Sequence, residues 1–229
     1  MSGPPPLGLT IALPRGALFA PALALLQRLG IDTHELESNE RRLIFPEIGV
    51  ITMRPSDVPT YVEAGAADVG ITGRDVLLEQ SELAGREGRA VYELLDLGFG
   101  RAVMVLASAR SEGEDPARRA LRRLGVMRVA TKYPRIAAGH LERTGRQAEI
   151  VEVKGSTELA PIAGLAEAIV DLTATGRTLQ ENNLVVREEI VVCTARLIAN
   201  PVSHKLKAQA LDELVQRLRK DGESNGFQG

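Results

Sequence analysis

The sequence is poor in the residues that form disulfides and metal sites. Only one of its 229 residues is cysteine, Cys193, so no disulfide can form within the chain. The three histidines, His34, His140 and His204, are scattered without the spacing of metal ligands. We therefore expect a cytoplasmic protein without a structural zinc site.

A strong charge excess and a long hydrophobic segment are also absent. Lys and Arg number 28 and Asp and Glu 30, which gives a formal net charge of −2. A chain with this balance lacks the positive field that holds long nucleic acids by counterion release. No apolar run approaches the roughly 20 residues that span a bilayer, and the opening MSGPPPLG has neither the basic start nor the apolar core of a signal peptide. We expect no nucleic-acid partner, no membrane insertion and no secretion.

The chain does contain an alternation of short apolar runs with helix-period segments. Runs of β-branched or apolar residues predict strands over 9–14, 50–54, 68–72, 101–107, 128–133, 148–153 and 168–173. Segments with Ser, Asp or Pro near the start and Gly near the end predict helices over 19–30, 56–65, 115–125, 134–145 and 156–166. Such alternation is typical of an α/β protein with mixed, mainly parallel sheets.

Two extended passages, 91–107 and 183–200, interrupt this alternation. Each holds two strand-like runs with no helix between them. A chain needs two such passages if it crosses from one lobe into a second lobe and later returns. We therefore predict a discontinuous first lobe, 1–95 plus 183–229, a second lobe, 96–182, and a cleft between them.

The stretch EAIVDLTATGRTLQENN, 167–183, loads a strand-to-helix turn with small polar residues. Such a turn presents backbone N–H groups at the positive end of the helix dipole, where phosphate groups bind. Gly176 lets the backbone approach an anion, and Asp171 at the strand end can accept hydrogen bonds from sugar hydroxyls. Hydroxyl donors and a charge come from Thr173, Thr175, Thr178 and Arg177. Alternatively, these residues are only good caps and turn formers.

The residues around this turn favour phosphate binding over capping alone, because they resemble those of the ATP phosphoribosyltransferase family. Members of this family catalyse the first step of histidine biosynthesis. The residues at the spacing of the family signature are Glu158, Gly164, Ala166, Ile169, Asp171, Leu172, Thr175, Gly176, Thr178 and Leu179. The resemblance continues in IALPRGAL, in MRPSDVPTYVEAGAADVGITGRDVL and in KGSTELAP, and so covers most of the chain.

Two positions depart from the family pattern. The family commonly has Lys-Gly-Arg where this sequence has Arg15, Gly16 and Ala17, which leaves the role of position 17 open. Glu167 stands where an aspartate is common, and we expect no consequence.

The resemblance implies a two-lobed fold similar to type II periplasmic binding proteins, with the active site in the cleft. It also implies the reaction: N1 of the ATP adenine displaces pyrophosphate from 5-phosphoribosyl 1-pyrophosphate (PRPP) to give N1-(5-phosphoribosyl)-ATP, with Mg2+ bound mainly through the pyrophosphate. The attacking nitrogen already carries a free lone pair, so neither a general base nor a covalent nucleophile is needed. Catalysis then rests on positioning and on neutralising the leaving group.

The resemblance also assigns the residues of the site. The 5-phosphate maps onto the turn and the ribose onto the strand end, so that the PRPP residues are Asp171, Leu172, Thr173, Ala174, Thr175, Gly176, Arg177 and Thr178. Arg15 and Arg54 are assigned to catalysis, because they follow predicted strands, where open α/β sheets bind ligands. The ATP side is assigned to Gly16, Gly70, Thr72, Gly73 and Asp75.

Several of these residues have a structural alternative. Arg54 could pair with Asp57 in an exposed contact worth roughly 0–1 kcal/mol. The residues of GITGRDVL could form only a strand end and a helix cap. The arginine cluster of 118–125 is most simply a solvated helix face. Arg41 and Arg42 are both candidates for phosphate contacts, and the sequence does not choose between them.

Two other functions compete with the transferase. One is a solute-binding protein of the same two-lobed fold, because fold does not give function. The other is an ordinary purine-type phosphoribosyltransferase, which usually carries two adjacent acids before its loop. In this sequence Leu172 follows a lone Asp171.

The last predicted helix has Ser203 as its cap and an apolar face made by Leu211, Leu214, Val215 and Leu218. Longer members of the resembled family continue here into a small domain that binds histidine. We therefore expect the short form, a homodimer within a hetero-oligomer whose separate regulatory subunit resembles histidyl-tRNA synthetase. The alternative is an unregulated enzyme whose apolar helix face packs on its own lobe.

Overall fold

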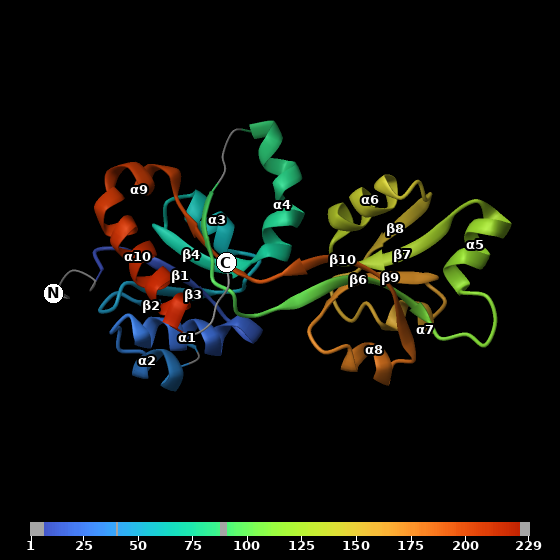
Figure 1. Cartoon of the computed structure of the whole chain (residues 1–229), viewed down its shortest axis with the longest axis horizontal. Helices are drawn as coiled ribbons and strands as arrows, with labels where there is room; N and C mark the ends of the chain where they lie inside the picture. Colours follow the sequence, from blue (N-terminus) through green and yellow to red (C-terminus); the bar gives the residue numbers. More distant parts are fainter. Residues whose placement is uncertain (1–6, 40, 88–90, 225–229) are drawn as a thin grey trace. The chain divides into compact units, whose positions relative to one another are not determined.

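The structure, a computed structural model, describes residues 7–39, 41–87 and 91–224. It divides into two compact units, Met1–Gly100 with Thr194–Gly229, and Arg101–Cys193. Each unit contains its own β-sheet with helices beside it (Figure 1).

The sheet of the first unit has its described strands in the order β2-β3-β1-β4-β11-β5. These strands are β1 (Ile11–Pro14), β2 (Ile44–Phe45), β3 (Val50–Met53), β4 (Val69–Gly73), β5 (Tyr92–Asp96) and β11 (Ala195–Ala199). The helices of this unit are η1 (Gly16–Leu18), α1 (Phe19–Arg28), α2 (His34–Ser38), α3 (Val58–Glu63), α4 (Arg74–Glu87), α9 (Pro201–Leu206) and α10 (Ala208–Ser224).

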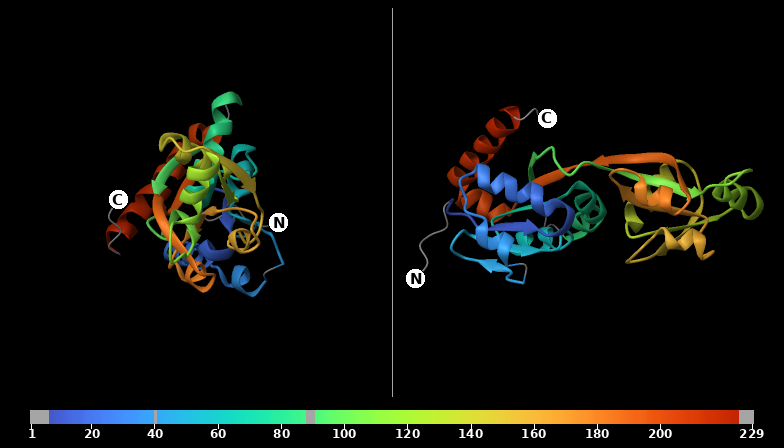
Figure 2. Two further views of the ribbon diagram at one scale, coloured as in Figure 1. Left: turned by 90° about the vertical axis from the view of Figure 1, so that its right-hand side faces the viewer. Right: turned by 90° about the horizontal axis from the view of Figure 1, so that it is seen from below.

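The sheet of the second unit has the order β10-β6-β9-β7-β8. Its strands are β6 (Ala102–Ala109), β7 (Met127–Thr131), β8 (Ala148–Glu152), β9 (Ala168–Thr173) and β10 (Leu184–Cys193). Its helices are α5 (Pro116–Leu124), α6 (Pro134–Arg143), α7 (Leu159–Ile162) and α8 (Arg177–Glu181). The long strands β6 and β10 run side by side (Figure 2).

The core of the second unit follows from the two-residue period of its strands. Met104 and Leu106 of β6 belong to a buried cluster that includes residues of α5 and α6. Val105 and Ala107 point to the opposite face and belong to a cluster with Ala160 of α7 and Leu179 of α8. Both faces of the sheet are therefore covered, which explains why its strands read as nearly continuous apolar runs.

Helix α5 shows how capping residues in the sequence set the two ends of a helix. The side chain of Asp115 accepts a hydrogen bond from the Ala117 N–H, and Gly125 ends the helix in the left-handed conformation with φ 74°. Ala117 and Ala120 are buried, while the four arginines of the helix are exposed. The prediction of a solvated arginine face is therefore confirmed.

The predicted strands all form, but parallel pairing does not dominate the sheets. The parallel pairs among the described strands are β1 with β3, β1 with β4, β7 with β8, and β7 with β9. The antiparallel pairs are β2 with β3, β4 with β11, β5 with β11, β6 with β9, and β6 with β10. The extended passages account for most of this difference, since β5, β6, β10 and β11 run without the crossover helices that parallel neighbours require.

The two extended passages each supply one strand to each sheet, but the division of the chain lies later than expected. The units divide at 100/101 and 193/194, whereas the sequence suggested 95/96 and 182/183. The larger shift arises because β10 pairs with β6 along its length and so belongs to the second unit.

The predicted cap of the last helix is wrong. Asn200 caps α9, because its side chain accepts hydrogen bonds from the N–H groups of Val202 (2.8 Å) and Ser203 (2.9 Å). Ser203 lies within α9, and its hydroxyl donates to Asp68 at 2.6 Å. The predicted apolar face does form: Leu211, Leu214 and Leu218 are buried in the core of the first unit and Val215 packs against it. None of the helices in the described ranges is both long and apolar enough to span a membrane.

Candidate active site

The loop after β9 has the backbone that an anion site requires. Gly176, the residue before α8, has φ 74° and ψ −1°, a left-handed conformation that glycine adopts without strain. The hydroxyl oxygen of Thr173 accepts a hydrogen bond from the Gly176 N–H at 2.9 Å, and that of Thr175 accepts one from the Arg177 N–H at 3.4 Å. These two threonines therefore shape the turn, as the capping alternative proposed, and both also line a pocket beside it.

A cavity of about 170 Å³ opens beside this loop. Its lining consists of Val105, Glu158, Asp171, Leu172, Thr173, Ala174, Thr175, Thr178 and Leu179. The structure thus brings together most of the predicted PRPP residues. Gly176 and Arg177 are not among the lining residues. The Arg177 guanidinium forms an i,i+4 ion pair with Glu181 at 2.8 Å, and its side chain is 82% exposed.

Asp171 is the most enclosed polar residue of the predicted loop. It is buried, and its Oδ1 accepts the Leu172 N–H at 2.7 Å and lies 3.2 Å from Nζ of Lys132. The hydroxyl of Thr157, itself buried, donates to Oδ2. The carboxylate therefore has a structural task, holding three segments together, besides any contact with a ribose. Thr157 and Lys132 were not among the residues singled out from the sequence.

In the first unit, the carboxyl ends of three parallel strands meet at one edge of the sheet. The register pairs Pro14 of β1 with Met53 of β3 and Ala12 of β1 with Gly70 of β4. Arg15, Arg54 and the start of α4 therefore follow neighbouring strands at the same edge, where open α/β sheets bind ligands.

The two predicted catalytic arginines differ in their surroundings. Arg54 is exposed, and no ion pair joins it to Asp57 within the ranges that the structure covers; Asp57 instead accepts a hydrogen bond from the Ser56 hydroxyl at 3.2 Å. The described structure therefore does not contain the Arg54–Asp57 ion pair that was the alternative to a catalytic role for Arg54. The Arg15 guanidinium stacks over the ring of Phe19 at 4.3 Å and donates to the Arg42 carbonyl at 3.4 Å.

Packing and hydrogen bonding within the first unit explain the presence of most residues assigned to ATP. A Cβ on Gly70 would lie 2.5 Å from a methyl group of Val58, so this glycine permits α3 to pack on β4. Thr72 is buried and donates to the Pro55 carbonyl at 2.8 Å. A Cβ on Gly73 would lie 2.0 Å from a carboxylate oxygen of Asp75, so Gly73 makes room for the acid of the first turn of α4.

Gly16 is the exception among the residues assigned to ATP. It is exposed, has φ 79°, and has nothing within 4 Å of an added Cβ. Its backbone is therefore open to a ligand in a way that the packed Gly70 is not.

The structure also separates Arg41 from Arg42. Arg42 forms ion pairs with Glu35 and, at 2.6 Å, with Glu47. It also donates to the Ile44 carbonyl at 2.9 Å and lies over the ring of Phe45. The hydrogen bond from Arg42 lowers the pKa of the Glu47 carboxyl. Arg42 is therefore a structural clamp, and exposed Arg41 remains as the candidate for a phosphate contact.

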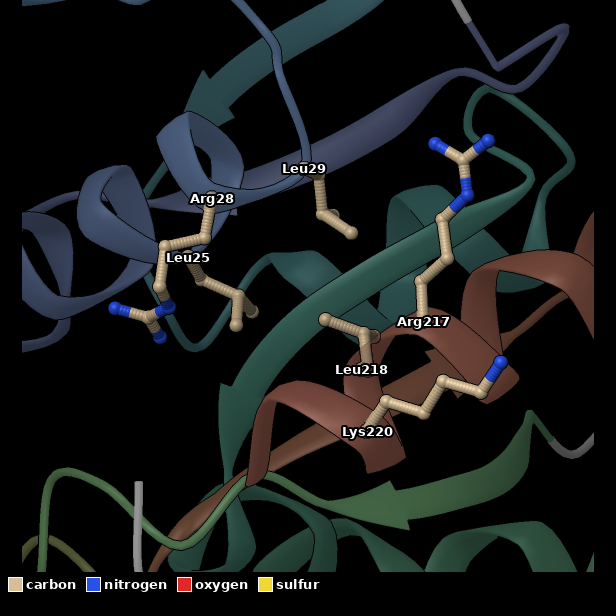
Figure 3. A pocket seen from close by; sticks show the side chains of 6 residues that line it. All are labelled: Leu25, Arg28, Leu29, Arg217, Leu218 and Lys220. Carbon is tan, nitrogen blue, oxygen red and sulfur yellow. The ribbon is translucent and has the colours of Figure 1, made fainter. Parts of the chain in front are cut away.

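Further hollows lie outside the predicted residues. In the first unit, a hollow of about 250 Å³ lies beside α1 and α10 and combines leucines with cations (Figure 3). It is lined by Leu25, Arg28, Leu29, Arg217, Leu218 and Lys220. Its apolar wall is continuous with the core of the unit, because Leu25 and Leu218 belong to that core.

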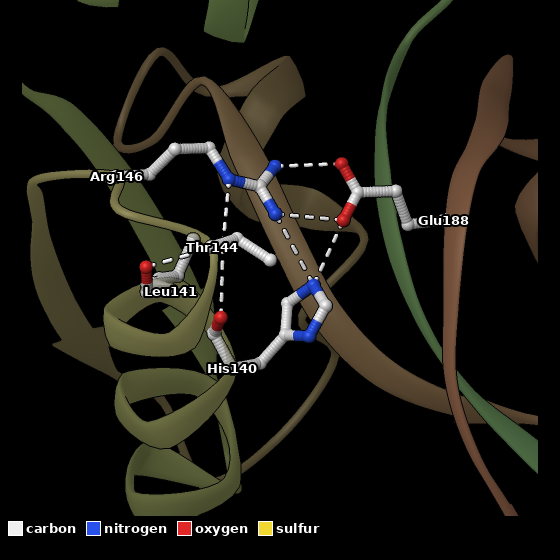
Figure 4. A network of polar contacts seen from close by, with 5 residues as sticks. All are labelled: His140, Leu141, Thr144, Arg146 and Glu188. Carbon is white, nitrogen blue, oxygen red and sulfur yellow. Dashed lines mark hydrogen bonds and ion pairs between the residues drawn. The ribbon is translucent and has the colours of Figure 1, made fainter.

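In the second unit, a wider hollow of about 1030 Å³ borders a polar network that links the segment after α6 to β10 (Figure 4). Arg146 donates to both carboxylate oxygens of Glu188 at 2.7 Å, and His140 lies 2.8 Å from one of them. The hydrogen bond from Arg146 outweighs burial and, with His140, lowers the pKa of Glu188. The charges at this hollow are thus largely satisfied within the protein.

The two units, the first of them discontinuous, define the class: an α/β protein with the fold of the periplasmic-binding-protein type. A structure of the ArgBP of Thermotoga maritima aligns with TM-score 0.57 at 16% identity, over 96% of this chain and 92% of that one. A structure of a protein bound to L-arginine aligns with TM-score 0.58 at 12% identity, over 96% and 88%. These two similarities show the fold alone.

Sequence comparison gives the family. The family model described as ATP phosphoribosyltransferase matches residues 54–220, and the chain belongs to this family. An ATP phosphoribosyltransferase of Rubrobacter xylanophilus is 49% identical over 96% of this chain and 99% of its own, and one of Moorella thermoacetica is 46% identical over 95% of each. A solved complex, the ATP phosphoribosyl transferase (HisG:HisZ) complex from Thermotoga maritima, contains a chain that aligns with TM-score 0.74 at 34% identity, over 93% and 97%.

The family is one of pentosyltransferases, and its reaction is the first step of histidine biosynthesis. N1 of the ATP adenine displaces pyrophosphate from PRPP to give N1-(5-phosphoribosyl)-ATP. The expected identity, fold class and reaction are therefore confirmed, and the rival functions are set aside.

Proposed function

We propose that this chain performs the family reaction with PRPP bound at the loop that follows β9. The observation that supports this most strongly is the left-handed Gly176 at the start of α8, beside a cavity lined by Thr173, Thr175 and Thr178. Backbone N–H groups at a helix start and neighbouring hydroxyls are suited to a phosphate. Leu172 and Ala174 complete the lining beside these donors.

The arginines at the sheet edge of the first unit would stabilise the negative charge that develops on the leaving pyrophosphate. As the bond from C1 of PRPP to its pyrophosphate breaks, negative charge grows on the leaving group, and a positioned guanidinium stabilises it. We assign this role to Arg54, which is exposed and not paired with Asp57 in the described structure, with Arg15 as a second contributor. ATP would be bound by Gly16 and by the segment from Gly70 to Asp75.

Mg2+ usually keeps several waters and is bound through one or two carboxylates together with substrate phosphates. No group of three His, Cys, Asp or Glu side chains converges within the described residues. The two acids at the cavity are Glu158 and Asp171, and Asp171 is already occupied by Thr157, Leu172 and Lys132. We therefore propose that Mg2+ binds through the pyrophosphate oxygens of PRPP, where it would offset their charge.

We further propose a cytoplasmic homodimer that works within a hetero-oligomer with a regulatory subunit resembling histidyl-tRNA synthetase. The similarity to the Thermotoga maritima chain solved in a HisG:HisZ complex supports this partner. The chain alone should then be insensitive to histidine, and inhibition should appear only with the partner, by binding linkage. Titration of histidine against activity, with and without the partner, tests this. Full inhibition of the chain alone would contradict it.

The reaction itself can be tested with the purified chain, ATP, PRPP and Mg2+. The N1-ribosylated adenine absorbs ultraviolet light differently from ATP, so absorbance should rise only when all components are present. No change in absorbance, with the protein folded and supplied with its partner, would reject the transferase. A reaction that needs a free purine base in place of ATP would point to an ordinary phosphoribosyltransferase.

A further inference from the structure

The cavity beside the loop after β9 is lined by acidic rather than basic side chains, which is unusual for a site proposed to bind a phosphorylated sugar. Its lining includes two carboxylates, those of Glu158 and Asp171, and no cationic side chain among the described residues. Arg177, the cation of the loop itself, is paired with Glu181 and lies outside the lining. An anion placed beside two carboxylates needs a compensating positive charge, since like charges repel strongly at short range.

Lys132 is a cation that contacts one of these carboxylates, that of Asp171, although Lys132 itself is not among the lining residues of the cavity. Its Nζ lies 3.2 Å from Oδ1 of Asp171, and its side chain is 42% exposed. An ammonium group has three N–H donors. In the described part of the chain Asp171 is its ionic partner, and the Tyr133 ring centroid lies 5.3 Å from Nζ, so N–H donors of the ammonium remain for a ligand.

The sheet fixes where Lys132 lies. The parallel strands β7 and β9 pair Thr131 with Val170, so Lys132 and Asp171 are the next residues of two neighbouring strands. Buried Thr131 donates to the Val170 carbonyl at 2.7 Å and accepts the Tyr133 N–H at 2.9 Å, which anchors the turn on both sides of Lys132. The lysine is therefore held at the carboxyl end of the strand pair that carries the PRPP loop, the end where such sheets bind ligands.

We propose that Lys132 is a PRPP-binding residue whose ammonium, oriented by Asp171, supplies the positive charge that the loop cavity lacks. The proposal rests on the proposed function of this loop and adds a residue to it. Asp171 then acts mainly as a positioning residue for the lysine, with Thr157 holding its second oxygen. In a purely structural alternative, Lys132 only neutralises Asp171 and contacts no ligand.

The test is to replace Lys132 by methionine and by arginine and to measure steady-state kinetics for each substrate. Lys132→Met should raise the apparent KM for PRPP at least about tenfold, as expected for loss of a charged hydrogen bond, and change the KM for ATP less than about threefold. Lys132→Arg keeps the charge and should recover much of the loss. Arg123→Met, which removes an equal charge from the exposed face of α5, is the control and should resemble the wild type.

A second comparison separates ligand binding from a structural ion pair. If Lys132 only neutralises Asp171, the double variant Asp171→Asn with Lys132→Met should bind PRPP as well as Asp171→Asn alone. The proposal predicts that the double variant remains weaker. Should Lys132→Met unfold, Lys132→Gln at a temperature below its melting transition replaces it.

The outcomes are distinguishable from those of the proposed function. A wild-type chain that turns over ATP and PRPP, with Lys132→Met unchanged in its KM for PRPP, overturns this inference alone. Recovery in the double variant overturns it too. A folded wild-type chain that neither binds nor uses PRPP overturns both proposals together.

Discussion

The loop after β9 in the second unit, which we propose as the PRPP site, and the sheet edge of the first unit, which carries Arg15 and Arg54, are built in opposite ways. The loop comes from one continuous segment, in which strand, turn and helix follow within 168–181. The edge comes from three strands that are far apart in sequence, β1, β3 and β4, and only their pairing brings Arg15 and Arg54 to one side. A binding element encoded in one segment can be recognised locally, whereas one assembled by pairing cannot.

The two glycines that the sequence placed in these sites illustrate the difference. Gly176 has a left-handed backbone and open space beside its Cα, which is what close approach of a ligand requires. Gly70 lies in a strand against Val58 and Val62, where a Cβ would collide with both. The same residue type thus leaves open space at a turn in one unit and permits helix packing in the other.

The largest effect on substrate binding should come from closing the continuous loop. Gly176→Val places a branched side chain at a left-handed position where the phosphate must approach, so the apparent KM for PRPP should rise about 100-fold through loss of charged hydrogen bonds. The KM for ATP should change far less. Gly125→Val is a matched control, because Gly125 has the same φ of 74° and equally open surroundings but ends α5 and is not part of the loop after β9. Equal losses for both substrates in a folded Gly176→Val protein would remove the loop from the PRPP site.

The assembled edge should be most sensitive at Arg54. Removal of a contact made mainly in the transition state lowers kcat and kcat/KM together, and loss of one such donor costs about 100-fold to 1000-fold. Arg54→Ala should show both losses. The chemical step must be measured before the steady state, because slow product release can mask it. An unchanged rate of the chemical step would assign Arg54 to another role.

A smaller effect should separate the two neighbouring arginines of the first unit. Arg41→Ala should weaken substrate binding about tenfold and leave the melting temperature unchanged, if Arg41 contacts a phosphate. Arg42→Ala should instead lower the melting temperature, because Glu35 and Glu47 lose their common partner. Kinetics and thermal unfolding of both variants provide the test. The reverse pattern would make Arg42 the ligand residue and its ion pairs incidental.

The smallest effect concerns a buried acid that supports the fold of the first unit. Burial alone would raise the pKa of Asp68, but hydrogen bonds from Lys207, Ser203 and the Thr10 N–H outweigh it and lower the pKa below the ordinary value of 3.8. A group with a lowered folded pKa stabilises above its unfolded pKa, and this stability is lost as the pH falls below about 4.

The matching variant is Asp68→Asn, compared with the wild type by thermal unfolding between pH 6 and about pH 3. The wild type should lose melting temperature more steeply below about pH 4 than the variant, by a few degrees at most. Parallel curves would show that this ion pair does not contribute to the acid sensitivity.

The sequence predicted the local parts of the molecule well and the non-local parts less well. The strand before Asp171, the turn at Gly176 and the capped helix α5 follow from short patterns, and the structure contains each of them. The pairing of β10 with β6 depends on contacts between distant segments, so the lobe boundary was placed too early. Ser203 was predicted as the cap because serine is a typical cap residue, but the helix begins earlier, after Asn200, which accepts hydrogen bonds from the N–H groups of Val202 and Ser203.

The candidate site shows the same limit. Lys132 lies close to Asp171 only because β7 and β9 are neighbours, and the residues around it in the sequence form no pattern that predicts ligand binding. The fixed role of Arg42 likewise depends on acids at two other places in the chain, Glu35 and Glu47. Residues whose function depends on a partner far along the chain need the fold before they can be assigned.

The most direct test of the assignment is to identify the bond that the enzyme makes. The chain would be incubated with PRPP, Mg2+ and ATP carrying a nitrogen-15 label at N1, and the product examined by nuclear magnetic resonance while released pyrophosphate is counted. We predict a ribose C1 joined to the labelled N1, with one pyrophosphate released for each product molecule. A ribose joined to another atom, or pyrophosphate released without a ribosylated ATP, would contradict the account.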